Sequence, residues 1–242
     1  MAENDSKLKL LGTWASMYAI RVKIALNIKS LEYEYYEEPS EGNSELLLKS
    51  NPVHKKNPVL IHGEKPICES LIIVQYIDET WPSRGHAILP SDPYERAIAR
   101  FWAAYIDEKW FPTVKDIGWA AWGEGEREEA KKAAMAPVDE GSVLLEEAFG
   151  KCSKRKPFFG GDQIGFLDIA MGTTVRWLKA FEKLWDVEIL SEAKTPALLK
   201  WADNFCSHPA VKDVLPETEQ LVEFALVIAA KLRAAAAAPP PK

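Results

Sequence analysis

The sequence predicts an α+β domain at residues 1–82 followed by an all-α domain at residues 92–233. Strand-like and helix-like patterns alternate in the first part, whereas the patterns of the second part are helical nearly throughout. Between them the segment TWPSRGHAILP lacks periodicity and holds two prolines and a glycine, so residues 83–91 are expected to be a linker. The final segment, 234–242, ends in three prolines and a lysine and is expected to be disordered.

In the first domain, residues 7–11 alternate as a strand, a helix begins near Ser16, and residues 31–37 (LEYEYYE) alternate again. The remaining elements are a short helix at 45–49, a hairpin of strands at 59–62 and 67–68, and a helix from Ser70. The order β-α-β-α-β-β-α predicts a small mixed sheet flanked by helices, which is the thioredoxin-like arrangement.

The helix that begins near Ser16 has a helical apolar repeat. Ile20, Ile24 and Ile28 recur at helical spacing. This pattern places the basic residues Arg21, Lys23 and Lys29 on the outside of the helix.

Two helix starts are clear in the second domain. Asp92-Pro93 followed by Glu95 offers an N-cap, a proline at the first helical position and a capping-box carboxylate. Residues 159–162 (FGGD) predict a turn, and the next helix begins at about Gly165 with Asp168 in its first turn, where a carboxylate suits the positive helix end.

Composition limits the classes of function. Of 242 residues, 47% are hydrophobic and 27% are charged, which excludes a chain that is disordered as a whole. The formal net charge of −6 argues against binding to nucleic acid or to an anionic membrane. The longest run without charged residues, 10–20, is too short to span a bilayer, and the acidic start MAENDSK is unlike a secretion signal. We expect a cytoplasmic protein with small-molecule partners.

The cysteines and histidines predict no metal site. Cys68, Cys152 and Cys206 are odd in number and widely spaced, so neither a disulfide framework nor a C-x-x-C pair is available. The four histidines include no pair four residues apart and no H-E-x-x-H motif.

Ser16 is the first candidate for chemistry. A hydroxyl at the N-terminus of a helix can donate a hydrogen bond to an anion held there by the backbone N–H groups and the helix dipole. Alternatively, Ser16 only caps the helix. An acylated serine is not expected, because no G-x-S-x-G motif surrounds this residue.

Glu69 and Ser70, which open a helix directly after a strand, are the second candidate. The helix end would bind an α-carboxylate while Glu69 pairs with an α-amino group, which together would select an amino-acid moiety. Alternatively, Ser70 is only an N-cap beside a solvated Glu69. Lys56 could reach a second carboxylate of an extended ligand, and Asn57-Pro58 is a candidate cis peptide.

Aromatic residues are dense in the helical domain, and most of them are expected in its core. The group between Trp110 and Trp122 exceeds what one buried face easily holds. Part of it is a candidate lining for an apolar ligand pocket.

Several ordered segments carry a family resemblance. They are GTWAS at 12–16, RVKIAL at 21–26, SELLLKSNP at 44–52, VHKKNPVLIH at 53–62, CESLIIVQYIDETW at 68–81, ARFWAAYID at 99–107, FGGD at 159–162 and GFLDIA at 165–170. The chain resembles a plant tau class glutathione transferase from Leu8 to about Leu232. The resemblance implies a thioredoxin-like domain that binds glutathione, a helical domain that helps to bind the electrophile, and a homodimer.

The resemblance also implies residue roles. Ser16 would stabilise the glutathione thiolate, Glu69 and Ser70 would hold the γ-glutamyl group, Lys56 would contact the glycyl end, and Asn57 would act through its backbone. By position, the electrophile pocket would comprise Tyr18, Phe111, Lys115, Trp119, Trp177, Phe224 and Ile228.

The chain departs from the family pattern at three places. Met17 and Tyr18 stand where members commonly carry Pro and Phe, Asn43 stands where they carry Lys, and Asn57 where they carry Val or Ile. Asn43 therefore removes a cation that is expected near the glycyl carboxylate of glutathione, and its own side chain is expected to bind glutathione at that end.

The expected activity is conjugation of glutathione to apolar electrophiles, with peroxidase activity as a secondary possibility. Thiol transfer would need a cysteine where Ser16 stands. The alternative is a non-catalytic carrier of hydrophobic metabolites.

Overall fold

The computed structural model describes residues 7–39, 42–122 and 127–237. Its first half comprises β1 (Leu8–Gly12), α1 (Met17–Ile28), β2 (Tyr33–Glu37), α2 (Glu45–Ser50), β3 (Val59–His62), β4 (Lys65–Cys68) and α3 (Ser70–Thr80). Within the described residues the strands form one sheet in the order β2-β1-β3-β4. β1 is parallel to β2 and antiparallel to β3, and β3 is antiparallel to β4. The predicted order of elements is confirmed.

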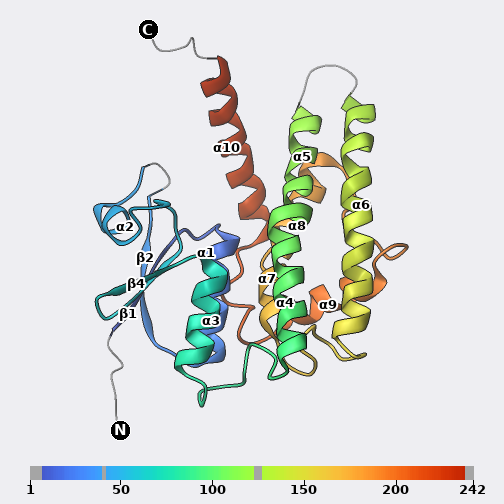
Figure 1. Ribbon diagram of the computed structural model, residues 1–242. Helices are drawn as coiled ribbons and strands as arrows, with labels where there is room; N and C mark the ends of the chain where they lie inside the picture. The colour runs from blue at the N-terminus through green and yellow to red at the C-terminus, as the bar shows by residue number, and fades with distance from the viewer. Residues whose placement is uncertain (1–6, 40–41, 123–126, 238–242) are drawn as a thin grey trace.

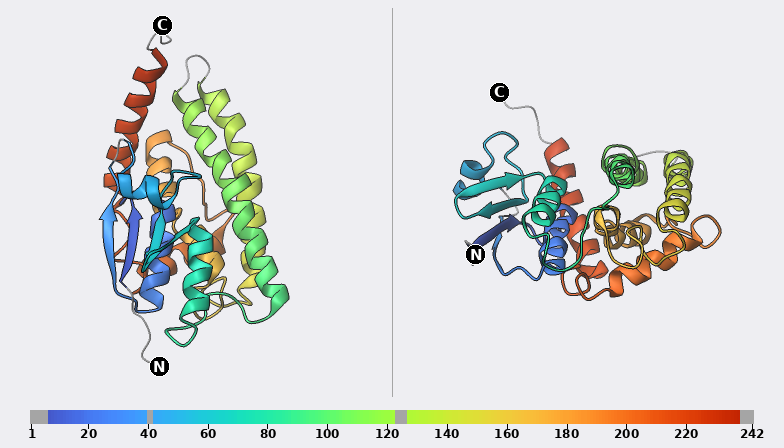
Figure 2. Two further views of the ribbon diagram at one scale, coloured as in Figure 1. Left: turned by 60° about the vertical axis from the view of Figure 1, so that its left-hand side comes forward. Right: turned by 60° about the horizontal axis from the view of Figure 1, so that its bottom comes forward.

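The second half is helical, as predicted. It comprises α4 (Pro93–Tyr105), η1 (Ile106–Trp110), α5 (Phe111–Trp122), α6 (Arg127–Cys152), α7 (Phe166–Gly172), α8 (Val175–Trp185), α9 (Pro196–Ser207) and α10 (Thr218–Ala237). Figure 1 shows α4 continuing into α5 as one long column beside α6, with α10 rising between this pair and the sheet domain; the right-hand view of Figure 2 shows the same arrangement.

Helix α10 continues four residues into the segment that was expected to be disordered, 234–242. Alanine, which occupies positions 234–237, has the highest intrinsic helix propensity, and this explains the extension. The remainder of that segment, 238–242, lies outside the described residues.

Helix α1 is buried on nearly all sides, so the expectation that its basic residues lie outside is wrong for two of them. Arg21 and Lys29 have no exposed surface, and Lys23 is half-buried with its ammonium 3.6 Å from the centre of the Tyr35 ring. The reason is that α1 packs against α3 of its own domain and against α7 of the helical domain, while the linker covers its C-terminal end. Its polar side therefore faces protein rather than solvent.

Lys29 fixes the linker. Its ammonium lies 2.7 Å from the Asp78 carboxylate and donates to the carbonyl of His86 at 2.8 Å, while Asp78 accepts the N–H groups of Ile88 and Leu89. The linker also passes so close to α1 that a Cβ on Gly85 would meet the carbonyl oxygen of Ile28 at 2.0 Å. Glycine is therefore required there.

Both predicted helix starts are confirmed. The Asp92 carboxylate accepts the N–H of Glu95 at the start of α4. Asp168 lies in the first turn of α7 and accepts four hydrogen bonds, from the N–H groups of Phe159, Gly160 and Gly165 and from the indole N–H of Trp201. Burial raises the pKa of Asp168 to about 6, although these four donors act in the opposite direction.

Candidate glutathione site

Ser16 stands where its sequence position predicts, at the N-cap of α1. Its N–H donates to the carbonyl of Thr13 at 3.0 Å, and its Oγ accepts the N–H of Ala19 at 3.2 Å. The residue is half-buried. Because the hydroxyl accepts from the backbone, its own proton is available for an anion above the helix end.

The helical domain braces the turn that carries Ser16. The indole N–H of Trp177 on α8 donates to the carbonyl of Ala15 at 2.9 Å. The ring of Phe224 on α10 lies 5.4 Å from that of Trp14 and 6.3 Å from that of Trp177. Trp177 and Phe224 were expected only as pocket residues, so this contact with the backbone next to Ser16 was missed.

Glu69 and Ser70 begin α3, but Ser70 does not cap it. The N-cap is Glu69, whose backbone has φ 71° and ψ 114° and whose side chain makes no capping hydrogen bond. A positive φ at a residue other than glycine is costly and is concentrated at functional sites. Glu69 is exposed, whereas Ser70 is buried and its Oγ lies 3.4 Å from an Arg21 nitrogen that donates to it. The interpretation of Ser70 as a simple cap is therefore wrong.

Arg21 joins four elements at this point. Its guanidinium donates to both carboxylate oxygens of Asp107 on η1, at 2.7 and 2.6 Å, and to the carbonyl of Ala170 on α7 at 2.7 Å. It also lies 5.1 Å from the centre of the Tyr18 ring. Burial, followed by the charges of Asp107 and Glu69, raises the pKa of Tyr18, so its phenol stays neutral.

Sequence reasoning missed both Arg21 and Asp107 as site residues. One signal in the sequence could have indicated that Arg21 is buried: it lies between Ile20 and Val22, in a helix that contains few other polar residues. Asp107 lies in a π-helical turn, a local insertion that is frequent at functional sites but has no simple repeat in the sequence.

A network of amides organises the loop that carries Lys56. The buried amide of Asn51 donates to the carbonyl of Lys56 at 2.9 Å and accepts the N–H of His54 at 3.1 Å. Asn43 donates to the carbonyl of Lys55 at 2.9 Å, so its side chain braces the loop. Lys56 itself is exposed, and the expected cis bond between Asn57 and Pro58 is confirmed.

The expected electrophile-pocket residues lie on α1, α5, α8 and α10. Phe111 has 5% of its surface exposed, packs 6.5 Å from the Phe181 ring and lies 5.6 Å from the Lys115 ammonium. Tyr18 is 36% exposed, and Ile228 is half-buried. Trp119 belongs to α5, but its side chain lies outside the described residues. Trp110 and Phe111, at the start of the dense aromatic group, are thus both buried.

Among the described residues, no group of three or more His, Cys, Asp or Glu side chains is placed to hold a metal ion. No helix in this part of the chain combines the length and the apolar character needed to cross a membrane.

Both halves of the chain match known family models. Residues 6–79 match the N-terminal domain of glutathione S-transferases, and residues 101–209 match their C-terminal domain. Glutathione S-transferase U17 of Arabidopsis thaliana is 57% identical over 97% of this chain and all of its own length. The crystal structure of the tau class glutathione S-transferase MiGSTU from mango, Mangifera indica, is 60% identical, with a TM-score of 0.87 over 92% of this chain and 98% of its own. The chain belongs to the plant tau class of glutathione S-transferases.

A more distant solved structure has the same architecture. Rice GST1 (OsGSTU1), solved in complex with glutathione, is 35% identical, with a TM-score of 0.81 over 93% of this chain and 99% of its own. This glutathione S-transferase has the two domains that the family models describe: a thioredoxin-like N-terminal domain and a helical C-terminal domain.

Proposed function

We propose that this tau class protein conjugates the thiolate of glutathione to apolar electrophiles, with Ser16 as the group that stabilises the thiolate. The observation that carries the proposal is the position of the hydroxyl of the half-buried Ser16 at the N-terminus of α1. The glutathione complex of the related rice protein supports the choice of co-substrate.

The energetics are sufficient for this role. A free thiol has a pKa of about 8.5 and is only slightly ionised at pH 7, and lowering that pKa by about two units requires about 2.7 kcal/mol. A hydrogen bond to a charged group contributes about 1.5–3 kcal/mol. The helix N-terminus adds about 1 kcal/mol. One hydroxyl at the start of α1 can therefore ionise the thiol.

The rest of glutathione is assigned to the neighbouring residues. Glu69 pairs with the α-amino group and Ser70 holds the α-carboxylate of the γ-glutamyl end, with Arg21 orienting the Ser70 hydroxyl. Asn57 binds through its backbone next to the cis proline. Lys56 meets the glycyl carboxylate, and Asn43 supports its loop through the carbonyl of Lys55. The opposite charges of Glu69 and Lys56 fix the direction of the peptide.

The electrophile is assigned to the side of Ser16 that faces the helical domain. Its contacts are Tyr18, Phe111, Lys115, Trp119, Trp177, Phe224 and Ile228. The proposal includes a homodimer in the cytoplasm and a secondary peroxidase activity. In that reaction the same thiolate attacks one oxygen of an organic hydroperoxide, the O–O bond breaks and the alcohol leaves, and a second glutathione converts the resulting sulfenic acid to the disulfide and water. The alternative is a non-catalytic carrier of hydrophobic metabolites.

Turnover of glutathione with a reactive aryl halide separates the enzyme from the carrier. Ser16→Ala should keep the fold but lower conjugation about 10- to 150-fold, equivalent to the loss of one hydrogen bond to a thiolate. The apparent thiol pKa in the pH–rate profile should rise. Full activity with an unchanged thiol pKa would refute the role of Ser16, and absence of turnover by the wild type would favour the carrier.

Ser16→Cys tests the location of the ligand independently of the rate. A thiol at this position should form a mixed disulfide with oxidised glutathione, detected by mass spectrometry. Failure to form it, while Ser16→Cys remains folded, would show that the glutathione sulfur does not lie above the start of α1.

A further inference from the structure

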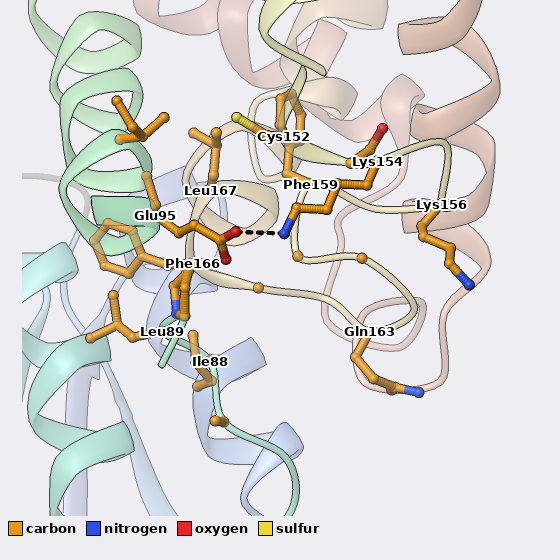
Figure 3. Close-up of a pocket in the computed structure, with 18 of the residues that line it drawn as sticks. Ile88, Leu89, Glu95, Cys152, Lys154, Lys156, Phe159, Gln163, Phe166 and Leu167 are labelled. Carbon is orange, nitrogen blue, oxygen red and sulfur yellow. Dashed lines mark hydrogen bonds and ion pairs between the residues drawn. The ribbon is translucent and has the colours of Figure 1, made fainter. Parts of the chain in front are cut away.

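A cavity of about 710 Å³ opens where the linker meets the helical domain, away from the residues assigned to glutathione (Figure 3). It is bounded by residues 87–91 of the linker, residues 94–102 of α4, the end of α6 and the segment 153–167. Its lining includes neither Ser16 nor any residue of the Lys56 loop or the start of α3. The volume lies within the range of small-molecule sites, about 300–1,000 Å³.

The walls of this cavity, which we call the junction cavity, are largely apolar. They are formed by Ile88, Leu89, Ile98, Trp102, Phe159, Phe166 and Leu167. Figure 3 shows several of these side chains around one central space. The thiol of Cys152 also lines it, and burial, followed by the charges of Asp168 and Glu95, raises the pKa of that thiol, so it adds no charge at neutral pH. These walls fit an apolar, ring-containing body.

An ion pair lies at one side of this space, and the lining also includes Ser91, Lys151, Asp162 and Gln163. Glu95 extends from α4 and Lys154 from the segment after α6, and the two meet as an ion pair (Figure 3). The side chains are 45% and 68% exposed, so their pairing contributes little to stability and they can accept a new partner. Lys156, in contrast, pairs with Asp162 at 3.2 Å and points away from the space.

The backbone holds Lys154 in an unusual conformation. Lys154 and Arg155 have φ values of 52° and 68°, and two successive left-handed residues other than glycine are costly. The turn directs Lys154 back toward α4, where it meets Glu95.

The charges select the head group of a ligand. For a carboxylate near this ion pair the attraction of Lys154 is offset by the repulsion of Glu95, and for an ammonium the signs are reversed, so a charged head group gains little net energy. A hydroxyl can donate to Glu95 and accept from Lys154 at the same time. We propose that the junction cavity binds a neutral aromatic alcohol or phenol, with its rings against the apolar walls and its hydroxyl between Glu95 and Lys154.

The test compares three probes of similar shape: 2-naphthol, 2-naphthoate and naphthalene. At pH 7 the first is neutral, because phenols ionise near pH 10, whereas the second is charged. Equilibrium dialysis against the full-length protein is performed with saturating S-hexylglutathione, which blocks the proposed catalytic site. We expect 2-naphthol to bind about tenfold more tightly than either other probe, the equivalent of one hydrogen bond to a charged group.

Four variants locate the site. Lys154→Met and Glu95→Gln should each weaken binding of 2-naphthol about tenfold, because each removes one charged partner of the hydroxyl. Lys156→Met is the matched control, since it removes an exposed lysine of the same segment, and it should change the affinity less than about twofold. Ile98→Trp fills the cavity from α4 and should abolish binding, with thermal unfolding and transferase activity as controls for the fold.

Three results would overturn the inference. Displacement of 2-naphthol by S-hexylglutathione would assign its binding to the catalytic site. Equal affinity for 2-naphthol and naphthalene would remove the role of the ion pair. Absence of saturable binding to the wild type would show that the cavity is not a ligand site. Lys154→Met and Glu95→Gln change exposed side chains, so this part of the test does not depend on the folding of Ile98→Trp.

Discussion

Asp107→Asn is expected to weaken both the fold and the binding of glutathione. Arg21 has no exposed surface, and Asp107, with 23% of its side chain exposed, accepts two of its hydrogen bonds. Removing one partner of a buried ion pair costs about 3–5 kcal/mol, because the other charge remains uncompensated. Asparagine keeps one acceptor oxygen, and the carbonyl of Ala170 remains in place, so we expect a loss of about 2–3 kcal/mol.

Urea unfolding at pH 7 measures this loss, and steady-state kinetics measures its effect on the site. Because Arg21 orients the Ser70 hydroxyl, the KM for glutathione should rise about three- to tenfold, while kcat changes less since the γ-glutamyl end is remote from the sulfur. Asp116→Asn, an exposed aspartate of the following helix α5, is the matched control and should change neither quantity.

A loss of stability below about 1 kcal/mol in Asp107→Asn would refute the reasoning, since Arg21 would then be held by Ser70 and Ala170 alone. The double variant Arg21→Met/Asp107→Leu supplies a further check. It removes both charges, so it should be more stable than the variant that leaves Arg21 without its carboxylate.

Three further outcomes are expected. Trp177→Phe loses the hydrogen bond to the carbonyl of Ala15, which is worth about 1 kcal/mol. It should lower kcat/KM about fivefold and raise the apparent thiol pKa, while the circular dichroism spectrum stays unchanged. An unchanged pH–rate profile would contradict this. Asn43→Lys should lower the KM for glutathione by a factor equivalent to at most about 1 kcal/mol, with constant kcat, and the gain should shrink in high salt. Folding raises the pKa of Asp168 to about 6, whereas the pKa in the unfolded chain is about 3.9. Ionisation of Asp168 between about pH 4 and pH 7 should therefore lower the free energy of unfolding of the wild type by about 3 kcal/mol relative to that of Asp168→Asn. A difference in free energy of unfolding between the two proteins that grows in favour of the wild type toward pH 7 would contradict this.

The elements and caps could be predicted because their signals are local. A strand repeats every two residues and a helix about every 3.6, so the order of elements in the first domain was visible in the chain. Ser16, Asp92 and Asp168 each bond to a backbone N–H three residues away in sequence. A short sequence window therefore contains both partners of these bonds.

The buried charges could not be predicted in this way. Arg21 and Lys29 fall on the polar side of α1, but a helical repeat does not reveal that the helical domain covers Arg21 or that α3 and the linker cover Lys29. Their partners, Asp107 and the carbonyl of His86, lie 86 and 57 positions away in the chain. The Asn43 amide was likewise assigned to a ligand, whereas its partner in the structure is a backbone carbonyl twelve residues away.

These contacts also make the proposed glutathione site depend on the helical domain. The carbonyl next to Ser16 is bonded to Trp177 of α8, and Arg21, which donates to Ser70, is held by Asp107 of η1. Trp177 contacts Phe224 of α10, and both are assigned to the electrophile pocket. Substitutions that reshape the proposed pocket for a different electrophile would therefore act on the same contacts that position the Ser16 hydroxyl. Changes in substrate choice and in the ionisation of glutathione should consequently be coupled, because one aromatic cluster contributes to both.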